Sequence, residues 1–277
     1  MGLTLSHNDL TRYSRQIILP HVGLAGQQQL ARARVLVVGA GGLGSAVLAY
    51  LAAAGVASQS PGLLGIAEGD DVDLSNLQRQ VLYTTADIGK SKAGMAAEAL
   101  QALNPELRVR LEPHLTADNA VATLQAYDLV IDGSDTWTSR NIVNQASVLT
   151  STPLVYGAAE QWSGQVSIFN LTPESACFRC AFPDAPTEST SCAEVGVLGA
   201  VTGVIGSVMA SEAVKLILNR QSRRQQTMNK QAPEDNALSL LDSTLWHWDG
   251  LNQDTIKIKL AKRADCEVCG QHQLHSV

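Results

Sequence analysis

The sequence has no excess of positive charge. Its 277 residues include 20 Lys and Arg against 26 Asp and Glu, which gives a formal net charge of −6. Nucleic-acid binding depends on a basic surface that neutralises phosphates, so nucleic acid is not expected as a partner. Hydrophobic residues make up 45% of the chain, which is typical of a globular protein with a sizeable core.

The sequence also lacks a secretory signal and a clear membrane span. The first residues, MGLTLSHNDLTRYSRQ, are polar and charged. The uncharged run 195–211 is rich in Gly, Ala and Ser, and Glu212 and Lys215 follow it. A span needs roughly 20 apolar residues, so this run predicts a buried helix instead. We therefore expect a cytoplasmic protein with no membrane partner.

Cysteine is scarce, and its placement is informative. Four of the five cysteines form two Cys-x-x-Cys pairs, Cys177/Cys180 and Cys266/Cys269. In a reducing compartment such pairs more often bind metal than form disulfides. Four thiolates are the tetrahedral set that Zn²⁺ prefers, and a site filled by protein ligands is structural. The alternative is a redox Cys-x-x-Cys, and Cys192 stands outside both pairs.

Apolar strands and helical patterns alternate over the first part of the chain, and no internal repeat is present. An amphipathic helical region, broken at Pro20, precedes them at residues 1–33. Strands are expected at 34–38, 63–67, 107–111, 127–132 and 153–156, and helices at about 42–55, 90–103, 117–126 and 140–149. This alternation predicts an α/β fold with a doubly wound, mostly parallel, Rossmann-like sheet.

The pattern changes in the C-terminal part. We expect a strand at 164–170, a mobile loop at 181–191, a long helix at 202–218, a polar surface or disordered connection at 219–237, and antiparallel strands at 237–248 and 255–262. The whole chain, 1–277, is therefore predicted to be a single domain. Its nucleotide-binding half is 1–160, and its antiparallel, zinc-bearing half is 161–277.

A glycine-rich turn joins the first strand to the first long helix. Gly39, Gly41 and Gly44 occupy the G-x-G-x-x-G positions. The first glycine makes the tight turn, the second lets the backbone approach phosphate, and the third allows close helix packing. The helix N-terminus adds partial positive charge. The motif indicates a nucleotide without specifying which one.

Charged residues around this turn favour ATP over a dinucleotide. Acids after the second strand, Glu68–Asp71, are placed for ribose hydroxyls. Arg79 and Lys92 add two cations, and Asp135 follows the fourth strand. Cations offset the charge that develops on pyrophosphate, and a carboxylate can hold Mg²⁺. Hydride transfer would need none of this set.

Taken together, the motifs resemble those of the ubiquitin-activating-like adenylyltransferases, and within them the MoeB/ThiF/HesA group. The resemblance covers almost the whole chain, in order. It rests on the glycine turn, both cysteine pairs, and the stretches 12–16 (RYSRQ), 74–80 (LSNLQRQ), 132–135 (DGSD) and 191–196 (SCAEVG).

The resemblance implies that the enzyme adenylates the C-terminal glycine of a ubiquitin-like, MoaD-like or ThiS-like sulfur carrier bound by the second half of the chain. It implies catalytic or binding roles for Arg15, Arg79, Lys92, Asp135 and Cys192. Arg79 and Lys92 would hold phosphates, and Asp135 would bind Mg²⁺. Arg15 would reach the ATP of a neighbouring subunit, which implies a homodimer. The remaining nucleotide contacts would come from Gly39, Gly41, Gly42, Gly44, Glu68, Asp70, Ser75 and Asn76, and zinc would be structural.

The resemblance also implies a later sulfur-transfer step from a cysteine desulfurase or rhodanese-type donor. The stretch 191–196 and Cys266-Glu-Val-Cys-Gly270 favour molybdopterin synthesis. The alternative is thiamine-thiazole synthesis with Cys192 linked covalently to the carrier. Unless its pKa is lowered, Cys192 is a small hydrophobe.

Each residue also has a simpler explanation. Arg15 is then a solvated surface charge, Asn76 or Asp135 a cap, and Lys92 a partner of Glu98. Two departures from the family pattern add to this: an insertion near 58–62, and Glu68 where Asp is usual. The insertion either bulges outward or displaces the ribose acid. Rival functions are an NAD-dependent oxidoreductase, a non-catalytic carrier-binding module, and cyclisation of a tRNA carboxylate, which the acidic charge disfavours.

Overall fold

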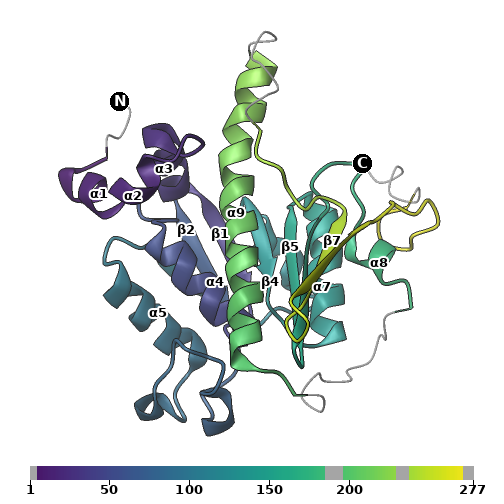
Figure 1. Cartoon of the computed structure of the whole chain (residues 1–277), viewed down its shortest axis with the longest axis horizontal. Helices are drawn as coiled ribbons and strands as arrows, with labels where there is room; N and C mark the ends of the chain where they lie inside the picture. The colour runs from purple at the N-terminus through teal and green to yellow at the C-terminus, as the bar shows by residue number, and fades with distance from the viewer. Residues whose placement is uncertain (1–4, 185–195, 229–236, 271–277) are drawn as a thin grey trace.

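An eight-stranded sheet organises the computed structural model, which describes residues 5–184, 196–228 and 237–270 (Figure 1). The strand order is β3-β2-β1-β4-β5-β6-β7-β8. The first five in this order are parallel and the last three antiparallel, which confirms the predicted sheet. The strands are β1 (Arg34–Val38), β2 (Leu63–Ala67), β3 (Val109–Glu112), β4 (Leu129–Asp132), β5 (Leu154–Glu160), β6 (Ser163–Phe169), β7 (Thr244–Asp249) and β8 (Asp254–Lys259).

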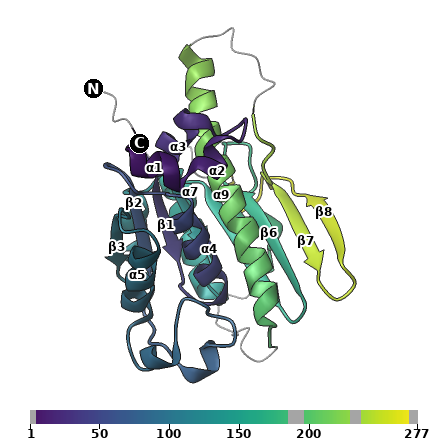
Figure 2. The same cartoon turned by 60° about the vertical axis from the view of Figure 1, so that its left-hand side comes forward.

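Both faces of the parallel strands are buried, so β1 is apolar throughout. Val35 and Val37 pack into one core with helices α4 (Gly42–Ala53), α5 (Lys92–Leu103) and α9 (Gly199–Met228). Leu36 and Val38 pack into the other with α6 (Ala120–Leu124) and α7 (Trp137–Thr150). Figure 2 shows α4 and α9 side by side over the first face. This two-sided covering explains the continuous apolar strands in the sequence.

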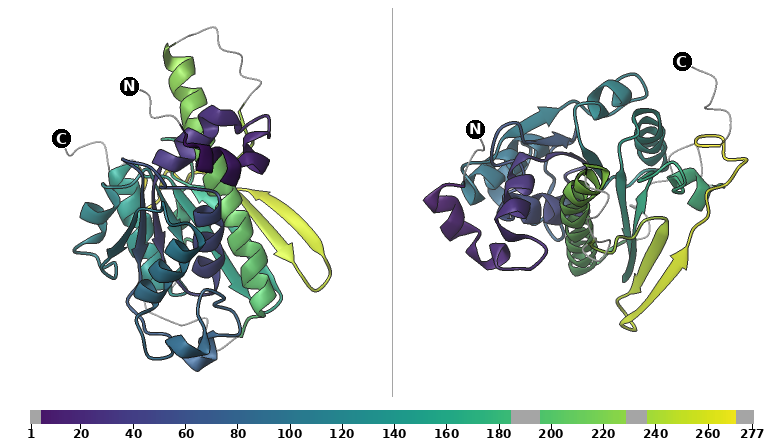
Figure 3. Two further views of the ribbon diagram at one scale, coloured as in Figure 1. Left: turned by 90° about the vertical axis from the view of Figure 1, so that its left-hand side faces the viewer. Right: turned by 90° about the horizontal axis from the view of Figure 1, so that it is seen from above.

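The N-terminal helices are tied to the amino edge of the sheet. The predicted break at Pro20 lies between α2 (Ser14–Ile17) and α3 (Gly23–Arg32), and α1 (His7–Arg12) precedes them. Gln16 donates to the carbonyl of Ala54 at 2.8 Å, just after the C-terminal end of α4. Seen from above, these helices and the β7–β8 hairpin lie on opposite sides of the molecule (Figure 3). The shorter elements are η1 (Leu74–Asn76), η2 (Thr85–Asp87) and α8 (Phe178–Ala181).

Helix α9 is longer than predicted. A polar connection was expected from residue 219, but the helix continues to Met228. Arg and Gln, which dominate this part of the sequence, are good helix formers, so their polarity does not end the helix. Residues 229–236 of the expected connection, and 185–191 of the expected mobile loop, lie outside the described residues. After the gap, Leu241 returns to α9 and donates its N–H to Glu212 Oε2 at 3.0 Å.

The apolar part of α9 is a core helix. By length and composition alone, Gly199–Asn219 could cross a membrane, yet 61% of its apolar window is buried inside the protein. It packs against α4, β5 and β6. The predicted buried helix is thus confirmed.

The insertion near 58–62 lies at the amino end of β2, far from the acid that follows the strand. Gln59 N donates to the Ala31 carbonyl at 2.8 Å, and Gly62 N donates to Gln59 O at 2.7 Å. From Arg34↔Leu63 to Val38↔Ala67, β2 stays in register with β1. The alternative in which the insertion displaces Glu68 is therefore wrong, because the insertion ends before the strand begins, with Ser60 and Pro61 exposed.

Candidate functional site

The glycine turn lies where β1, β2 and β4 end together. Neighbours β2 and β4 flank β1, so this is the point at which the sheet order reverses, where open α/β sheets bind ligands. Gly39 has φ +83°, and a Cβ on it would lie 3.0 Å from the Gly133 carbonyl oxygen. A Cβ on Gly44 would lie 2.0 Å from Gly39 O. Both positions therefore require glycine, as the motif predicted.

The helix that begins at this turn has an open N-terminus. Gly41 is the N-cap of α4 and supplies no side-chain hydrogen bond, and Gly42 is the first helical residue. The first N–H groups of a helix have no intrahelical acceptor, and together with the helix dipole they form an anion site. The four glycines thus lie together at one edge of the sheet.

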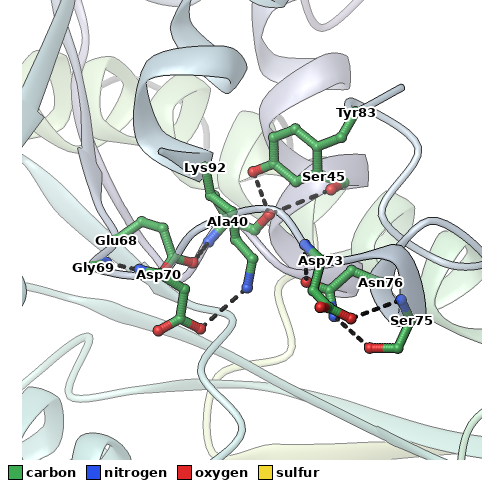
Figure 4. A network of polar contacts seen from close by, with 10 residues as sticks. All are labelled: Ala40, Ser45, Glu68, Gly69, Asp70, Asp73, Ser75, Asn76, Tyr83 and Lys92. Atoms are coloured by element: carbon green, nitrogen blue, oxygen red, sulfur yellow. Dashed lines mark hydrogen bonds and ion pairs between the residues drawn. The ribbon is translucent and has the colours of Figure 1, made fainter. Parts of the chain in front are cut away.

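The Ala40 peptide in the turn is held at both ends (Figure 4). Its N–H donates to Glu68 Oε2 at 2.8 Å, and its carbonyl accepts from the Tyr83 hydroxyl at 2.8 Å. Burial, with the charge of Glu68 nearby, raises the pKa of Tyr83, so the phenol stays neutral and able to donate. These contacts fix the turn before any ligand arrives.

Glu68 is largely committed to backbone groups. Besides Ala40, it accepts from Gly69 N at 2.7 Å and Asp70 N at 2.9 Å, both through Oε1. A carboxylate has about four acceptor positions, so one is left, on Oε2. The extra methylene relative to Asp lets the side chain reach back to the glycine turn. Glu68 stands at the predicted place with room for one further donor.

Lys92, at the start of α5, is buried against the same edge. Its ammonium lies 3.1 Å from Asp70 Oδ2, with the lysine side chain 7% exposed and the aspartate side chain 75% exposed. Lys92 is therefore neither a partner of Glu98 nor a solvated surface charge, and both simpler explanations for it are wrong. Figure 4 shows the pair beside the Ala40 peptide. Because its partner Asp70 is exposed to solvent, the Lys92 ammonium can bind a second anion from solvent.

The short helix η1 brings Arg79 to the glycine turn. The Arg79 guanidinium donates through Nη1 to Ser75 O at 3.0 Å, and a Cβ on Gly42 would lie 3.3 Å from Arg79 Cγ. Asp73 caps the segment by accepting from Ser75 N at 2.8 Å, and Asn76 Oδ1 completes the capping box by accepting from Asp73 N. The capping explanation for Asn76 is thus confirmed, and it leaves a half-buried amide beside Arg79.

Asp135 projects from the loop after β4. It is exposed and has no hydrogen-bond or ion-pair partner in the described part of the chain. The helix cap is Thr136, whose Oγ1 accepts from Ser139 N at 3.2 Å, so the prediction of Asp135 as N-cap is wrong. Asp135 is available for a ligand.

A buried arginine supports this loop. Arg140 donates to the Ser134 carbonyl through Nη2 at 3.1 Å and stacks on the rings of Trp137 and Tyr156. Burial raises the pKa of the neighbouring Asp132, and the charge of Arg140 opposes that rise. Sequence reasoning treated Arg140 only as a helix residue, and its spacing from Asp135 carries no signal of this role.

Arg15 is not brought to this edge within the chain. It is exposed on α2, beside Gln16, which bonds to the far end of α4. The 12 residues of α4 span about 18 Å, so Arg15 lies roughly one helix length from the glycine turn. In the described chain Arg79, Lys92 and Asp135 therefore lie at the same edge of the sheet, and Arg15 does not.

The four paired cysteines form one buried cluster at the opposite, amino edge. Their sulfur atoms all lie within 4.8 Å of one another. Individual Sγ–Sγ separations are 3.9 Å (177–180), 3.7 Å (177–266) and 3.4 Å (180–269). These separations are too long for disulfide bonds. In a tetrahedral site with zinc–sulfur distances of about 2.3 Å, the sulfur atoms lie about 3.8 Å from one another. The predicted four-sulfur set is confirmed as a cluster that fits a metal ion.

Comparison with known proteins places the chain in a family. The model of the ThiF family matches residues 13–268. The chain belongs to the ThiF family. Among its relatives, a sulfur carrier protein adenylyltransferase of Thermus thermophilus is 46% identical over 269 residues, which is 95% of this chain and 91% of the relative. The resemblance inferred from the motifs is thereby confirmed.

Two other ThiF-family relatives are longer. MOCS3 of Culex quinquefasciatus, named an adenylyltransferase and sulfurtransferase, is 41% identical, over 97% of this chain and 57% of its own length. MoeZ of Mycobacterium tuberculosis, a probable adenylyltransferase/sulfurtransferase, is 47% identical, over 77% of this chain and 55% of its own. This chain spans just over half the length of these relatives.

Solved structures share the ThiF-family fold. E. coli MccB with ATP superposes with a TM-score of 0.74 at 19% identity, covering 94% of this chain and 73% of that chain. PaaA gives 0.73 at 21% identity, covering 95% and 77%. At such identities the likeness concerns the fold alone. In this ThiF-family chain, Cys192 lies outside the described residues, so its predicted role stays a prediction.

Proposed function

We propose that this ThiF-family chain adenylates the C-terminal glycine of a ubiquitin-like sulfur-carrier protein. The observation that carries the proposal is the arrangement at the carboxyl edge of the sheet. There the glycine turn leads into an uncapped helix N-terminus, and Arg79 and Lys92 lie beside it. Asp135, exposed and without a partner among the described residues, follows β4 at the same edge. The names of its relatives support the reaction type.

The reaction follows from this arrangement. The α4 N-terminus and the glycine turn hold the triphosphate of ATP, and the last acceptor position of Glu68 takes a ribose hydroxyl. An oxygen of the carrier's terminal carboxylate bonds to the α-phosphorus. The α-phosphorus–oxygen bond to the β-phosphate breaks, and pyrophosphate leaves with the electron pair. Arg79 and Lys92 offset the charge on that leaving group.

Asp135 is the residue that fits a Mg²⁺ ion. Its carboxylate is exposed beside the turn, and Arg140 fixes the loop behind it. A bound Mg²⁺ supplies neutralisation of the phosphate oxygens. At the other edge, Cys177, Cys180, Cys266 and Cys269 fit a structural zinc ion, because all four positions around the metal come from protein sulfur.

The assignment of pathway and partners extends this proposal. Residues 1–160 bind the nucleotide and 161–277 the carrier, in a single cytoplasmic domain. The names MOCS3 and MoeZ favour the molybdopterin route, with a cysteine desulfurase or rhodanese as sulfur donor. Exchange of labelled pyrophosphate into ATP, measured with purified MoaD-like and ThiS-like carriers, tests the reaction and the pathway together. Exchange only with ThiS-like carriers would select the thiamine route, in which Cys192 forms the covalent link.

The same assay separates the rival functions. ATP and carrier binding without pyrophosphate exchange would mean a non-catalytic carrier-binding module. Absorbance changes with NAD(P)H in the absence of ATP would mean an oxidoreductase. Either result would contradict the proposal.

A homodimer follows if Arg15 serves the site of a neighbouring subunit, since it is a helix length from its own. Arg15→Ala and Lys92→Met are each expected to be inactive. Mixed subunits should recover about a quarter of the wild-type rate, because about half the dimers are mixed and each has one complete site. An active Arg15→Ala variant, or no recovery on mixing, would contradict the shared site.

A further inference from the structure

One buried side chain beside the glycine turn has no role in the reaction as described above. Gln80 is 3% exposed and follows Arg79 in the chain. Its Oε1 has no hydrogen-bond partner among the described residues. A buried polar atom without a partner destabilises a protein, so a side chain that carries one requires an explanation.

The backbone fixes where this side chain lies. Gln80 N donates to Asn76 O at 3.0 Å, and Gln80 O accepts from Tyr83 N at 3.2 Å. Tyr83 itself bonds to Ala40 O in the glycine turn. The Tyr83 bond to Ala40 therefore holds this segment against the turn, and the two backbone bonds of Gln80 fix where its side chain begins.

The Gln80 amide faces the N-cap of α4. A Cβ built on Gly41 would lie 3.6 Å from Gln80 Nε2. The nitrogen of the amide is thus the group nearest the turn, at an ordinary van der Waals distance from that Cβ position. Nε2 carries two protons, and an N–H directed toward an open helix N-terminus adds to the donors available to an anion there.

We propose that Gln80 is a phosphate-binding residue whose amide nitrogen donates to an oxygen of the nucleotide phosphate held by the glycine turn. This inference rests on the proposed function and adds a residue to it. A phosphate oxygen can accept only from Nε2, so Oε1 stays without a partner in the complex as well. Leucine would fill similar space without that buried oxygen, so glutamine weakens the free protein. The hydrogen bond from Nε2 to the bound anion is the contribution that glutamine makes and leucine cannot.

The test compares Gln80→Leu with the matched variant Gln78→Leu, two residues away and exposed. ATP affinity is measured by calorimetry, and melting temperature with and without ATP. Gln80→Leu should weaken ATP binding by about tenfold to a hundredfold, the range for a hydrogen bond to a charged group. Its melting temperature without ATP should equal or exceed that of the wild type. Gln78→Leu should match the wild type in both measurements.

A second variant tests whether the side chain faces the phosphates. Gln80→Glu keeps the shape but places a carboxylate there, so it should bind ATP more weakly than Gln80→Leu, and increasingly so as the pH rises. If Gln80 only fills space, Gln80→Leu would bind ATP as tightly as the wild type. An ATP affinity of Gln80→Leu within twofold of wild type, or a Gln80→Glu variant that binds ATP at least as well as Gln80→Leu, would overturn the inference. If wild type itself fails to bind ATP, the proposed function fails instead.

Discussion

Replacing Lys92 by methionine is expected to lower the rate of ATP–pyrophosphate exchange by about 10²–10³-fold, the usual cost of losing one preorganised charge that stabilises a transition state. The ammonium is buried, and its Asp70 partner lies mostly in solvent. An exposed carboxylate regains water when the pair is broken, so the loss falls on the phosphate contact. Methionine replaces the aliphatic stem, which preserves packing at the start of α5.

The matched control for this change is Lys90→Met. Lys90 is two residues earlier, its side chain is 51% exposed, and it pairs with Asp87 at 3.2 Å. The Lys90→Met substitution removes the same charge from the same region. It should leave the exchange rate within about twofold of the wild-type rate, since exposed ion pairs contribute little. Rates are compared at saturating carrier over a range of ATP concentrations. A Lys92→Met enzyme that retains a third of the wild-type rate would refute the role of this ammonium.

The glycine turn at the carboxyl edge of the sheet could be predicted from the sequence, because its geometry allows only certain residue types. Gly39 and Gly44 lie where any side chain would strike backbone, and such constraints leave a recognisable motif. Parallel strands also bring their carboxyl ends to one edge, so residues after β1, β2 and β4 had to come together. The positions of Glu68 and Asp135 followed from strand order without any knowledge of side-chain contacts.

What the sequence did not predict depends on contacts between side chains. Nothing in Leu77-Gln-Arg-Gln80 distinguishes the exposed Gln78 from the buried Gln80. The Lys92–Asp70 pair joins residues 22 apart, and it depends on how α5 docks. The predicted end of the long helix, at residue 218, was wrong. Polar residues such as Arg and Gln can continue a helix as well as apolar ones, because helix formation follows backbone propensity.

The second large effect concerns the sulfur cluster, and Cys266→Ser is expected to abolish metal binding. The wild type should contain one zinc ion per chain by elemental analysis. Burial raises the pKa of Cys269 to about 12, so this thiol keeps its proton at neutral pH until a bound metal cation displaces it. Serine offers a hydroxyl that is far less acidic than a thiol, and three remaining sulfurs leave the tetrahedron open.

Loss of the metal should destabilise one region in particular. The four cysteines pack with Val148 of α7 and with Leu260 and Val268, so they join the segment after β8 to the rest of the protein. Removing such a link should lower the free energy of unfolding by about 4 kcal/mol or more, within the range reserved for loss of a metal site. Cleavage after β8 in limited proteolysis, with a lower melting temperature, would be the readout.

Cys192→Ser is the control, because it removes a cysteine from outside both pairs and should keep the metal and the melting temperature. The cluster lies at the amino edge, while the glycine turn lies at the carboxyl edge. Partial chelation that leaves the protein folded should therefore leave ATP affinity unchanged. If Cys266→Ser keeps its zinc, or if chelation weakens ATP binding in a protein that still melts normally, the structural assignment of the metal is wrong.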